Sequence, residues 1–171
     1  LDEKVFAHEW NLPMDSNRGM VAYSMVQERA TWLHYRNLRL LIGEKGDPAL
    51  YRLLGLIATD ECAHYNFFMR VMRLHLASDR ENTLEQLRRV LNGFAMPAVH
   101  MLTDGRKRME DVKALHIFDE EIFYRDVYLP ILEELNVSRH ELRRRDKREF
   151  ALVGAVAAPV KEDLSQLRKS A

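Results

Sequence analysis

Apolar residues recur every three or four positions along most of the chain, which is the spacing of one face of an amphipathic α-helix. No stretch of useful length alternates apolar and polar residues in the manner of a half-buried β-strand. Glycine and proline, which interrupt helices, are few, with 7 and 5 residues. The pattern therefore predicts an all-α protein with long antiparallel helices and shorter helices toward the C-terminus.

Two of the predicted helices are close to 30 residues, well above the globular mean of about 11–12. The first begins at a capping residue within 15–17 and runs to about residue 42, where Gly43 or Gly46 ends it. The second begins at Asp47-Pro48, a capping residue followed by a proline suited to the first helical position, and reaches about residue 77. Long helices joined by a short turn are expected to pack as antiparallel neighbours in a bundle.

Shorter helices are predicted on either side of this pair, while residues 106–116 fit no pattern clearly. Pro130 and Pro159 are expected to kink or break the helices that contain them. The predicted segments are the end of a helix in 1–10 and helices over 81–94, 118–135, 138–150 and 152–169.

Composition narrows the functional classes. The 171 residues are expected to form one domain, and the formal net charge of zero gives no overall field that would attract nucleic acid. The longest apolar run, residues 151–160, is too short for a membrane span. The single cysteine, Cys62, excludes an intramolecular disulfide and fits a reducing compartment such as the cytoplasm. Because the chain begins with Leu1, we expect it to be part of a longer protein.

The residues most suggestive of chemistry are three metal-type ligands on the two long helices. Glu61 and His64 are three residues apart, so they share one face of the second helix, and Glu28 lies at mid-length on the first. Both acids lie within apolar stripes, where a carboxylate without a partner is costly. Carboxylate and imidazole ligands together suit iron or manganese.

A plainer interpretation of these residues remains open. Glu28 could pair with an arginine, and a Glu-x-x-His spacing occurs often by chance on exposed helices. The charged face of the first helix carries Arg29, Arg36 and Arg39, and that of the second carries Arg70, all expected to point outward. Under this interpretation the chain is a metal-free helical interaction module.

The motifs themselves resemble those of a known family. Gln27-Glu28-Arg29-Ala30-Thr31, followed by Asp60-Glu61-x-x-His64, resembles the second half of the soluble acyl-[acyl-carrier-protein] desaturases. Met96-Pro97 and Asp104-Gly105-Arg106 are similar to the stretch that follows the metal helices of that family. The resemblance covers roughly residues 16–106 and is weaker toward the C-terminus.

The resemblance implies a ferritin-like helical bundle, a homodimer and a di-iron centre between four helices. It also implies a reaction in which dioxygen and two electrons from a ferredoxin-type donor introduce a double bond into a fatty acyl chain on acyl carrier protein. For location, the resemblance implies the cytoplasm, or the plastid stroma if the protein comes from a plant. Membrane-bound desaturases are excluded, because they require spanning helices and several histidine boxes.

The resemblance also implies roles for particular residues. Glu28, Glu61 and His64 would be iron ligands, and Thr31 would be the threonine near the oxygen-binding side. Asp60 would orient a ligand imidazole. Residues lining the acyl channel would include Met20, Val21 and Ser24.

The first Glu and the first Glu-x-x-His of the family have no counterpart in this chain. The 171 residues are therefore expected to be the C-terminal portion of a larger di-iron bundle, inactive alone. An alternative is that two copies face each other and complete the metal site as a ferritin-like assembly. In the isolated chain we expect an exposed apolar surface along Val21-Met25-Trp32 and Leu54-Ile57-Phe68.

Overall fold

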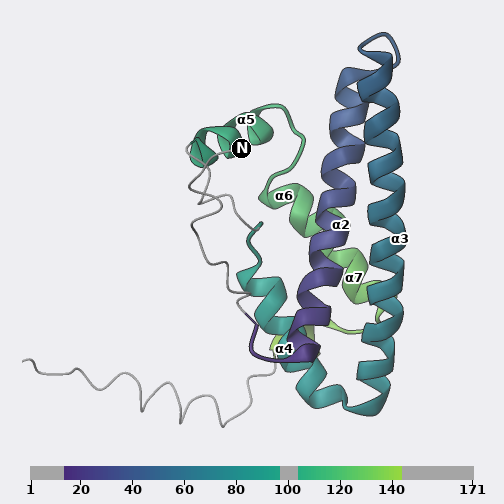
Figure 1. The fold of residues 1–171 in the computed structure, drawn as a ribbon. Helices are drawn as coiled ribbons and strands as arrows, with labels where there is room; N and C mark the ends of the chain where they lie inside the picture. The colour runs from purple at the N-terminus through teal and green to yellow at the C-terminus, as the bar shows by residue number, and fades with distance from the viewer. Residues whose placement is uncertain (1–13, 97–103, 144–171) are drawn as a thin grey trace, which may run out of the picture.

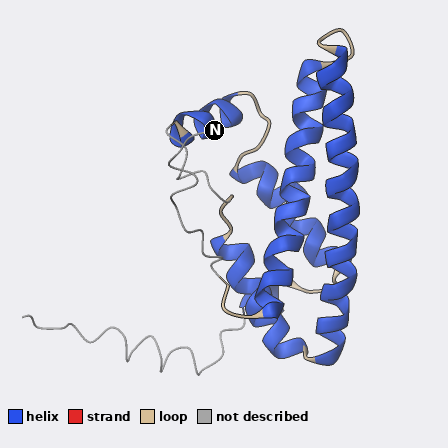
Figure 2. Cartoon of the chain, in the orientation of Figure 1, coloured by secondary structure: helices blue, strands red, loops and turns tan. Residues whose placement is uncertain are grey.

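The structure is a computed structural model that describes residues 14–96 and 104–143. Every regular element within these residues is a helix (Figure 2), which confirms the predicted all-α class. The helices predicted over 1–10 and 152–169 lie outside the described residues, together with Pro159.

The two long helices begin and end where local capping chemistry predicts. Helix α2 (Asn17–Ile42) is capped by Ser16, whose hydroxyl accepts the Gly19 N–H at 3.0 Å. It ends at Gly43, which adopts a φ of 65°, a conformation that glycine tolerates best. Helix α3 (Pro48–Ser78) is capped by the Asp47 carboxylate, which accepts two backbone N–H groups of the first turn at 2.8 and 3.0 Å.

Helices α2 and α3 lie side by side and antiparallel along most of their length (Figure 1). Helix α4 (Arg80–Gly93) packs against both near the end of the pair opposite the α2–α3 turn. The buried side chains of these helices form one core with residues of the C-terminal segment, by which we mean residues 104–143. Its largest fully buried members are Met25, Leu33, Met69, Met72, Leu87 and Ile131.

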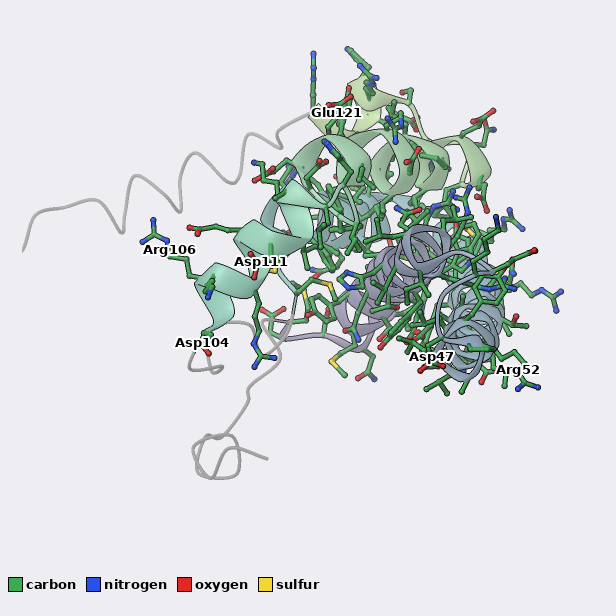
Figure 3. The ribbon with its side chains drawn as sticks, turned by 90° about the horizontal axis from the view of Figure 1, so that it is seen from above. Asp47, Arg52, Asp104, Arg106, Asp111 and Glu121 are labelled. Atoms are coloured by element: carbon green, nitrogen blue, oxygen red, sulfur yellow. The ribbon has the colours of Figure 1, made fainter. Side chains whose placement is uncertain are left out.

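The C-terminal segment packs along α2. Residues 106–116, which the pattern left unassigned, contain α5 (Gly105–Ala114). Viewed along the long helices, its Asp104 and Arg106 lie on the side of the molecule away from Asp47 and Arg52 of the α2–α3 turn (Figure 3). Three further elements follow without a break: α6 (Glu120–Ile122), the π-helical η2 (Phe123–Tyr128) and α7 (Leu129–Glu134). Asn136, with a φ of 51°, then ends this segment, and Ser138 caps α8 (Arg139–Arg143).

The sequence predicted that Pro130 kinks or breaks its helix, but the helix continues through this residue. The helix instead widens into the π turn of η2 just before the proline and continues through α7. Because proline has no N–H, the carbonyl of Asp126, four residues earlier, cannot receive its usual helical hydrogen bond. A side chain from α2 donates to this carbonyl instead, since Arg29 Nε lies 2.7 Å from the Asp126 oxygen.

The prediction that Arg29 points outward is therefore wrong. Its side chain is 12% exposed and also forms an ion pair with Glu134 at 2.8 Å. The guanidinium carbon lies 4.9 Å from the centre of the buried Tyr65 ring, within cation–π range. We call this group of Arg29, Tyr65, Glu134 and the Asp126 carbonyl the arginine anchor, because it ties α2 and α3 to the C-terminal segment.

The predicted apolar surface is displaced around α3. The prediction was wrong for Met25 and Leu54, which are both buried. Met25 belongs to the core that α2 and α3 share with the C-terminal segment, and Leu54 lies on α3, which packs along α2. The large apolar residues that remain exposed on α3 are instead Leu50, Leu53, Leu56, Phe67 and Leu74. In the described part of the chain, no helix is both long and apolar enough to cross a bilayer.

Candidate metal centre

Glu28, Glu61 and His64 converge on one point between α2 and α3. One potential ligand atom from each residue lies within 4.8 Å of the other two. His64 Nδ1 is 3.4 Å from Glu28 Oε2 and 3.5 Å from Glu61 Oε2. The prediction from helical spacing that these three side chains converge is therefore confirmed.

The three side chains differ in exposure. The Glu28 and Glu61 side chains are 17% and 19% exposed, whereas that of His64 is 59% exposed. Among the described residues, no lysine or arginine forms an ion pair with either carboxylate. The alternative in which Glu28 pairs with an arginine thus finds no support in this part of the chain, because the nearby Arg29 is committed to the arginine anchor.

Burial and the neighbouring acid act together on Glu28. Desolvation, and then the hydrogen bond and charge of Glu61, raise the pKa of Glu28 to about 7, while His64 acts in the opposite direction. Two carboxylates can share a hydrogen bond only when one of them holds a proton. The site therefore has a place for one positive charge between its acids.

A metal cation fits that place chemically. Two carboxylate oxygens and one imidazole nitrogen form a donor set suited to iron or manganese, and all three face one another within coordination-like distances. Three ligands do not complete a di-iron site, which in such bundles takes a Glu from each of two helices and a Glu-x-x-His from each of two others. This chain contributes one Glu helix and one Glu-x-x-His helix.

Among the described residues, none of the other predicted site residues forms a hydrogen bond with the side chains of Glu28, Glu61 or His64. The half-buried Thr31 donates its hydroxyl to the carbonyls of Gln27 and Glu28 at 3.0 and 3.1 Å, one turn earlier. Asp60 is exposed, and no hydrogen bond joins it to His64 within the described residues. The residues predicted to line an acyl channel are all half-buried on α2: Met20, Val21 and Ser24.

Sequence reasoning missed the arginine anchor. A signal for it existed, because a proline inside a predicted helix frees a carbonyl that some donor must satisfy. Which donor does so could not be read from the sequence, since Arg29 lies on a different helix and shares its type with many other residues.

Comparison with known proteins gives a consistent family assignment. A family model described as fatty acid desaturase matches residues 8–153. A stearoyl-[acyl-carrier-protein] 9-desaturase of Arabidopsis thaliana, named as chloroplastic, is 34% identical over 124 residues. This match covers 71% of the chain but 31% of the Arabidopsis protein.

Two other relatives give shorter matches. An acyl-[acyl-carrier-protein] desaturase of Oryza sativa is 35% identical over 88 residues, which is 50% of the chain and 21% of the rice protein. A stearoyl-[acyl-carrier-protein] 9-desaturase of Olea europaea is 29% identical over 84 residues, or 49% of the chain and 22% of the olive protein. The chain thus spans less than a third of the length of these relatives. No solved structure matches it.

Proposed function

Because the chain belongs to the fatty acid desaturase family, we propose that it is the part of an acyl-[acyl-carrier-protein] desaturase that supplies the second half of a di-iron centre. The observation that carries this proposal is the convergence of Glu28, Glu61 and His64, with no lysine or arginine of the described residues paired with either acid. Asp60 would orient the imidazole, and Thr31 would face the oxygen-binding side. The other ligands would come from a segment that precedes these helices in the longer protein.

The proposed reaction removes two hydrogens from neighbouring carbons of a carrier-bound acyl chain. Dioxygen accepts those hydrogens together with two electrons from a ferredoxin-type donor and two protons, which yields a double bond and two molecules of water. Iron, when bound, would supply the oxidising chemistry with dioxygen. In this chain Glu28, Glu61 and His64 would hold the metal, and Met20, Val21 and Ser24 would line the acyl path.

The exposed apolar stripe on α3 supports the view that further protein covers this side. Contiguous exposed apolar patches on soluble monomers are normally limited to a few hundred Å². Leu53, Leu56, Phe67 and Leu74 would be covered by the other helices of the bundle or by a second copy in a homodimer. The relatives are named as chloroplastic, and a plastid or cytoplasmic location is our expectation for this protein.

The test uses the full-length protein that contains these residues, with iron counted per subunit and turnover measured on acyl carrier protein loaded with a fatty acyl chain. Glu61→Ala should abolish iron retention and turnover together, because a ligand is lost. Glu44→Ala is the matched control, since Glu44 lies exposed in the α2–α3 turn and should change neither. Full iron content in the Glu61 variant would overturn the proposal.

The alternative, in which a second copy of this chain completes the metal site, makes a different prediction. If two of these 171-residue chains complete the centre, the isolated chain should bind iron as a dimer, with Glu61→Ala abolishing binding. If the preceding segment supplies the missing ligands, the isolated chain should retain no di-iron centre in any oligomeric state.

A further inference from the structure

A second site lies between α2 and α3, separate from the three candidate metal ligands. It is an open groove of about 600 Å³ that none of Glu28, Glu61 and His64 lines. Its walls include Arg36, Arg39 and two aromatic residues, Trp32 and Tyr51. No aspartate or glutamate lines it, so the positive charge of two guanidinium groups is not balanced within the groove.

The Arg39 side chain is held in place by a ring contact, but one of its hydrogen-bond donors has no acceptor. Its guanidinium carbon lies 4.1 Å from the centre of the Tyr51 ring, which fixes its orientation. Its Nε is buried and has no hydrogen-bond partner among the described residues. A buried guanidinium donor without an acceptor is costly, and an anionic ligand would supply the acceptor.

Gly55 makes the position of Arg39 possible. A Cβ added at Gly55 would lie 3.1 Å from the guanidinium carbon and from Nε of Arg39, closer than ordinary van der Waals contact. The glycine therefore leaves room for Arg39 to lie across α3, although glycine is unfavourable in a helix interior. This feature shapes the groove and has no part in the metal ligand set.

Arg36 brings the second charge. Its guanidinium carbon is 6.0 Å from the Trp32 ring, and no hydrogen bond or ion pair holds it within the described residues. Arg36 also borders a neighbouring groove that contains Asp126, so part of its charge is directed there. Arg39 should therefore contribute more than Arg36 to any ligand in the first groove.

We propose that this groove binds the phosphate group of a small ligand, with Arg39 as the main contact and Arg36 as the second. Two guanidinium groups match the charge of roughly −1.5 to −2 that a phosphate monoester carries at pH 7, and a planar guanidinium can bind phosphate through two parallel hydrogen bonds. The apolar part of the lining, which includes Ala58 and Leu40, would contact the carbon portion of an organic phosphate. Free phosphate and an organic phosphate share this chemistry.

The binding test titrates the full 171-residue chain with phenyl phosphate, inorganic phosphate and phenol at constant ionic strength, by calorimetry. Phenyl phosphate should bind and phenol should not. Tighter binding of phenyl phosphate than of inorganic phosphate assigns an organic ligand, and equal binding assigns free phosphate. Equal binding of phenol and phenyl phosphate, or no binding of either phosphate, would overturn the proposal.

Three variants locate the contact. Arg39→Gln should weaken phenyl phosphate binding about tenfold or more, because a charge-assisted hydrogen bond is lost. Arg70→Gln is the matched control, since Arg70 is exposed on α3 outside the groove, and it should change binding less than about twofold. Gly55→Ala should weaken binding several-fold while retaining all charges, because its Cβ displaces Arg39. Equal effects of Arg39→Gln and Arg70→Gln would show that binding is not in the groove.

A chemical readout tests the same contact independently of calorimetry. Cys62, the single cysteine of the chain, is half-buried and lines the groove. Phenyl phosphate should slow its alkylation by iodoacetamide, measured by intact mass, and should fail to do so in Arg39→Gln. Unchanged alkylation of the starting protein at saturating ligand would contradict the proposal.

Discussion

Glu28 and Arg29 are adjacent in α2, and both carry charge into the protein, but their surroundings differ. Arg29 meets a carbonyl, a carboxylate and an aromatic ring, all supplied by the chain itself. Glu28 meets a second acid and an imidazole, and its pKa rises to about 7 because the surroundings disfavour its charge. The fold therefore stabilises the charge of Arg29 and disfavours the charge of Glu28.

The difference separates structural charge from functional charge. A buried charge that serves stability is found with its counter-charges, as in the arginine anchor. A cluster of acids that lacks a counter-charge destabilises the folded chain unless a cation from outside binds there, and such clusters are typical of functional sites. Removing the charge of Arg29 should therefore lower the stability of the folded chain, whereas removing the charge of Glu28 should raise it.

The largest effect is expected at the anchor. Arg29→Ala should lower the free energy of unfolding by roughly 2–4 kcal/mol, because the Asp126 carbonyl and the Glu134 carboxylate lose their donor together. Urea denaturation followed by circular dichroism measures this change.

Two companion variants sharpen the result. Arg70→Ala, on the exposed face of α3, should change stability by less than about 0.5 kcal/mol. Arg29→Lys should recover only part of the loss, since an ammonium cannot reproduce two separate guanidinium hydrogen bonds. A stability loss in Arg29→Ala no greater than in Arg70→Ala would remove the contrast between the two sites.

Glu28→Gln should have the opposite effect in the metal-free chain. The folded-state pKa of Glu28 is about 7 and its ordinary value is 4.5, so the folded state holds the proton more tightly. Its contribution to stability therefore falls as pH rises from about 4.5 through about 7, and the penalty is fully present above that range. The neutral amide avoids this penalty, so the variant should be more stable at pH 8 by roughly 1–3 kcal/mol.

The measurement is unfolding with chelator present, at pH 4 and pH 8. The two proteins should be closest in stability at pH 4, where Glu28 is protonated, and should diverge at pH 8. A variant that is less stable than the starting protein at pH 8 would mean that the acids are already compensated, and the comparison with Arg29 would fail.

The parts of this contrast that the sequence predicted are those decided locally. Ser16, Gly43 and Asp47 set the helix ends through contacts within one turn, and helical periodicity alone brought Glu61 and His64 to one face. The direction of Arg29 depended on a carbonyl freed by a proline far along the chain, which periodicity cannot supply.

The exposed stripe on α3 shows the same limit in another form. Periodicity predicts that a helix has an apolar face, but the neighbouring helices decide which part of a broad apolar face is buried. Here Leu54 is buried on α3, which packs along α2, while its neighbours Leu53 and Leu56 remain exposed.

Glu141 extends the comparison to a surface acid with its partners in place. The N–H of Ser138, the side chain of Arg80 and the Ser138 hydroxyl lower the pKa of Glu141 to about 2. Because this pKa is depressed, its contribution is present above about pH 4.5 and lost as pH falls toward about 2, the reverse of Glu28. Glu141→Gln should cost about 0.5–1 kcal/mol at pH 7, reduced by the partial exposure of the carboxylate.

Unfolding at pH 7 and pH 2.5 checks this value. The difference between Glu141→Gln and the starting protein should shrink at the lower pH. A difference that grows on acidification would contradict the assignment of Glu141 as a stabilising charged group.

The smallest effect on stability is expected at Thr31, one turn from Glu28. Its hydroxyl bonds only to carbonyls of its own helix, so Thr31→Ala should change the free energy of unfolding by less than about 0.5 kcal/mol. In the full-length protein the variant should also retain iron, because the hydroxyl is not a ligand, while turnover with dioxygen should fall by up to the range of acid–base effects, about 10²–10⁴. Iron content, oxygen uptake and product formation, measured on one preparation, separate these outcomes. Loss of iron would move Thr31 into the ligand set, whereas unchanged stability, iron and turnover would leave it with no role beyond its own helix.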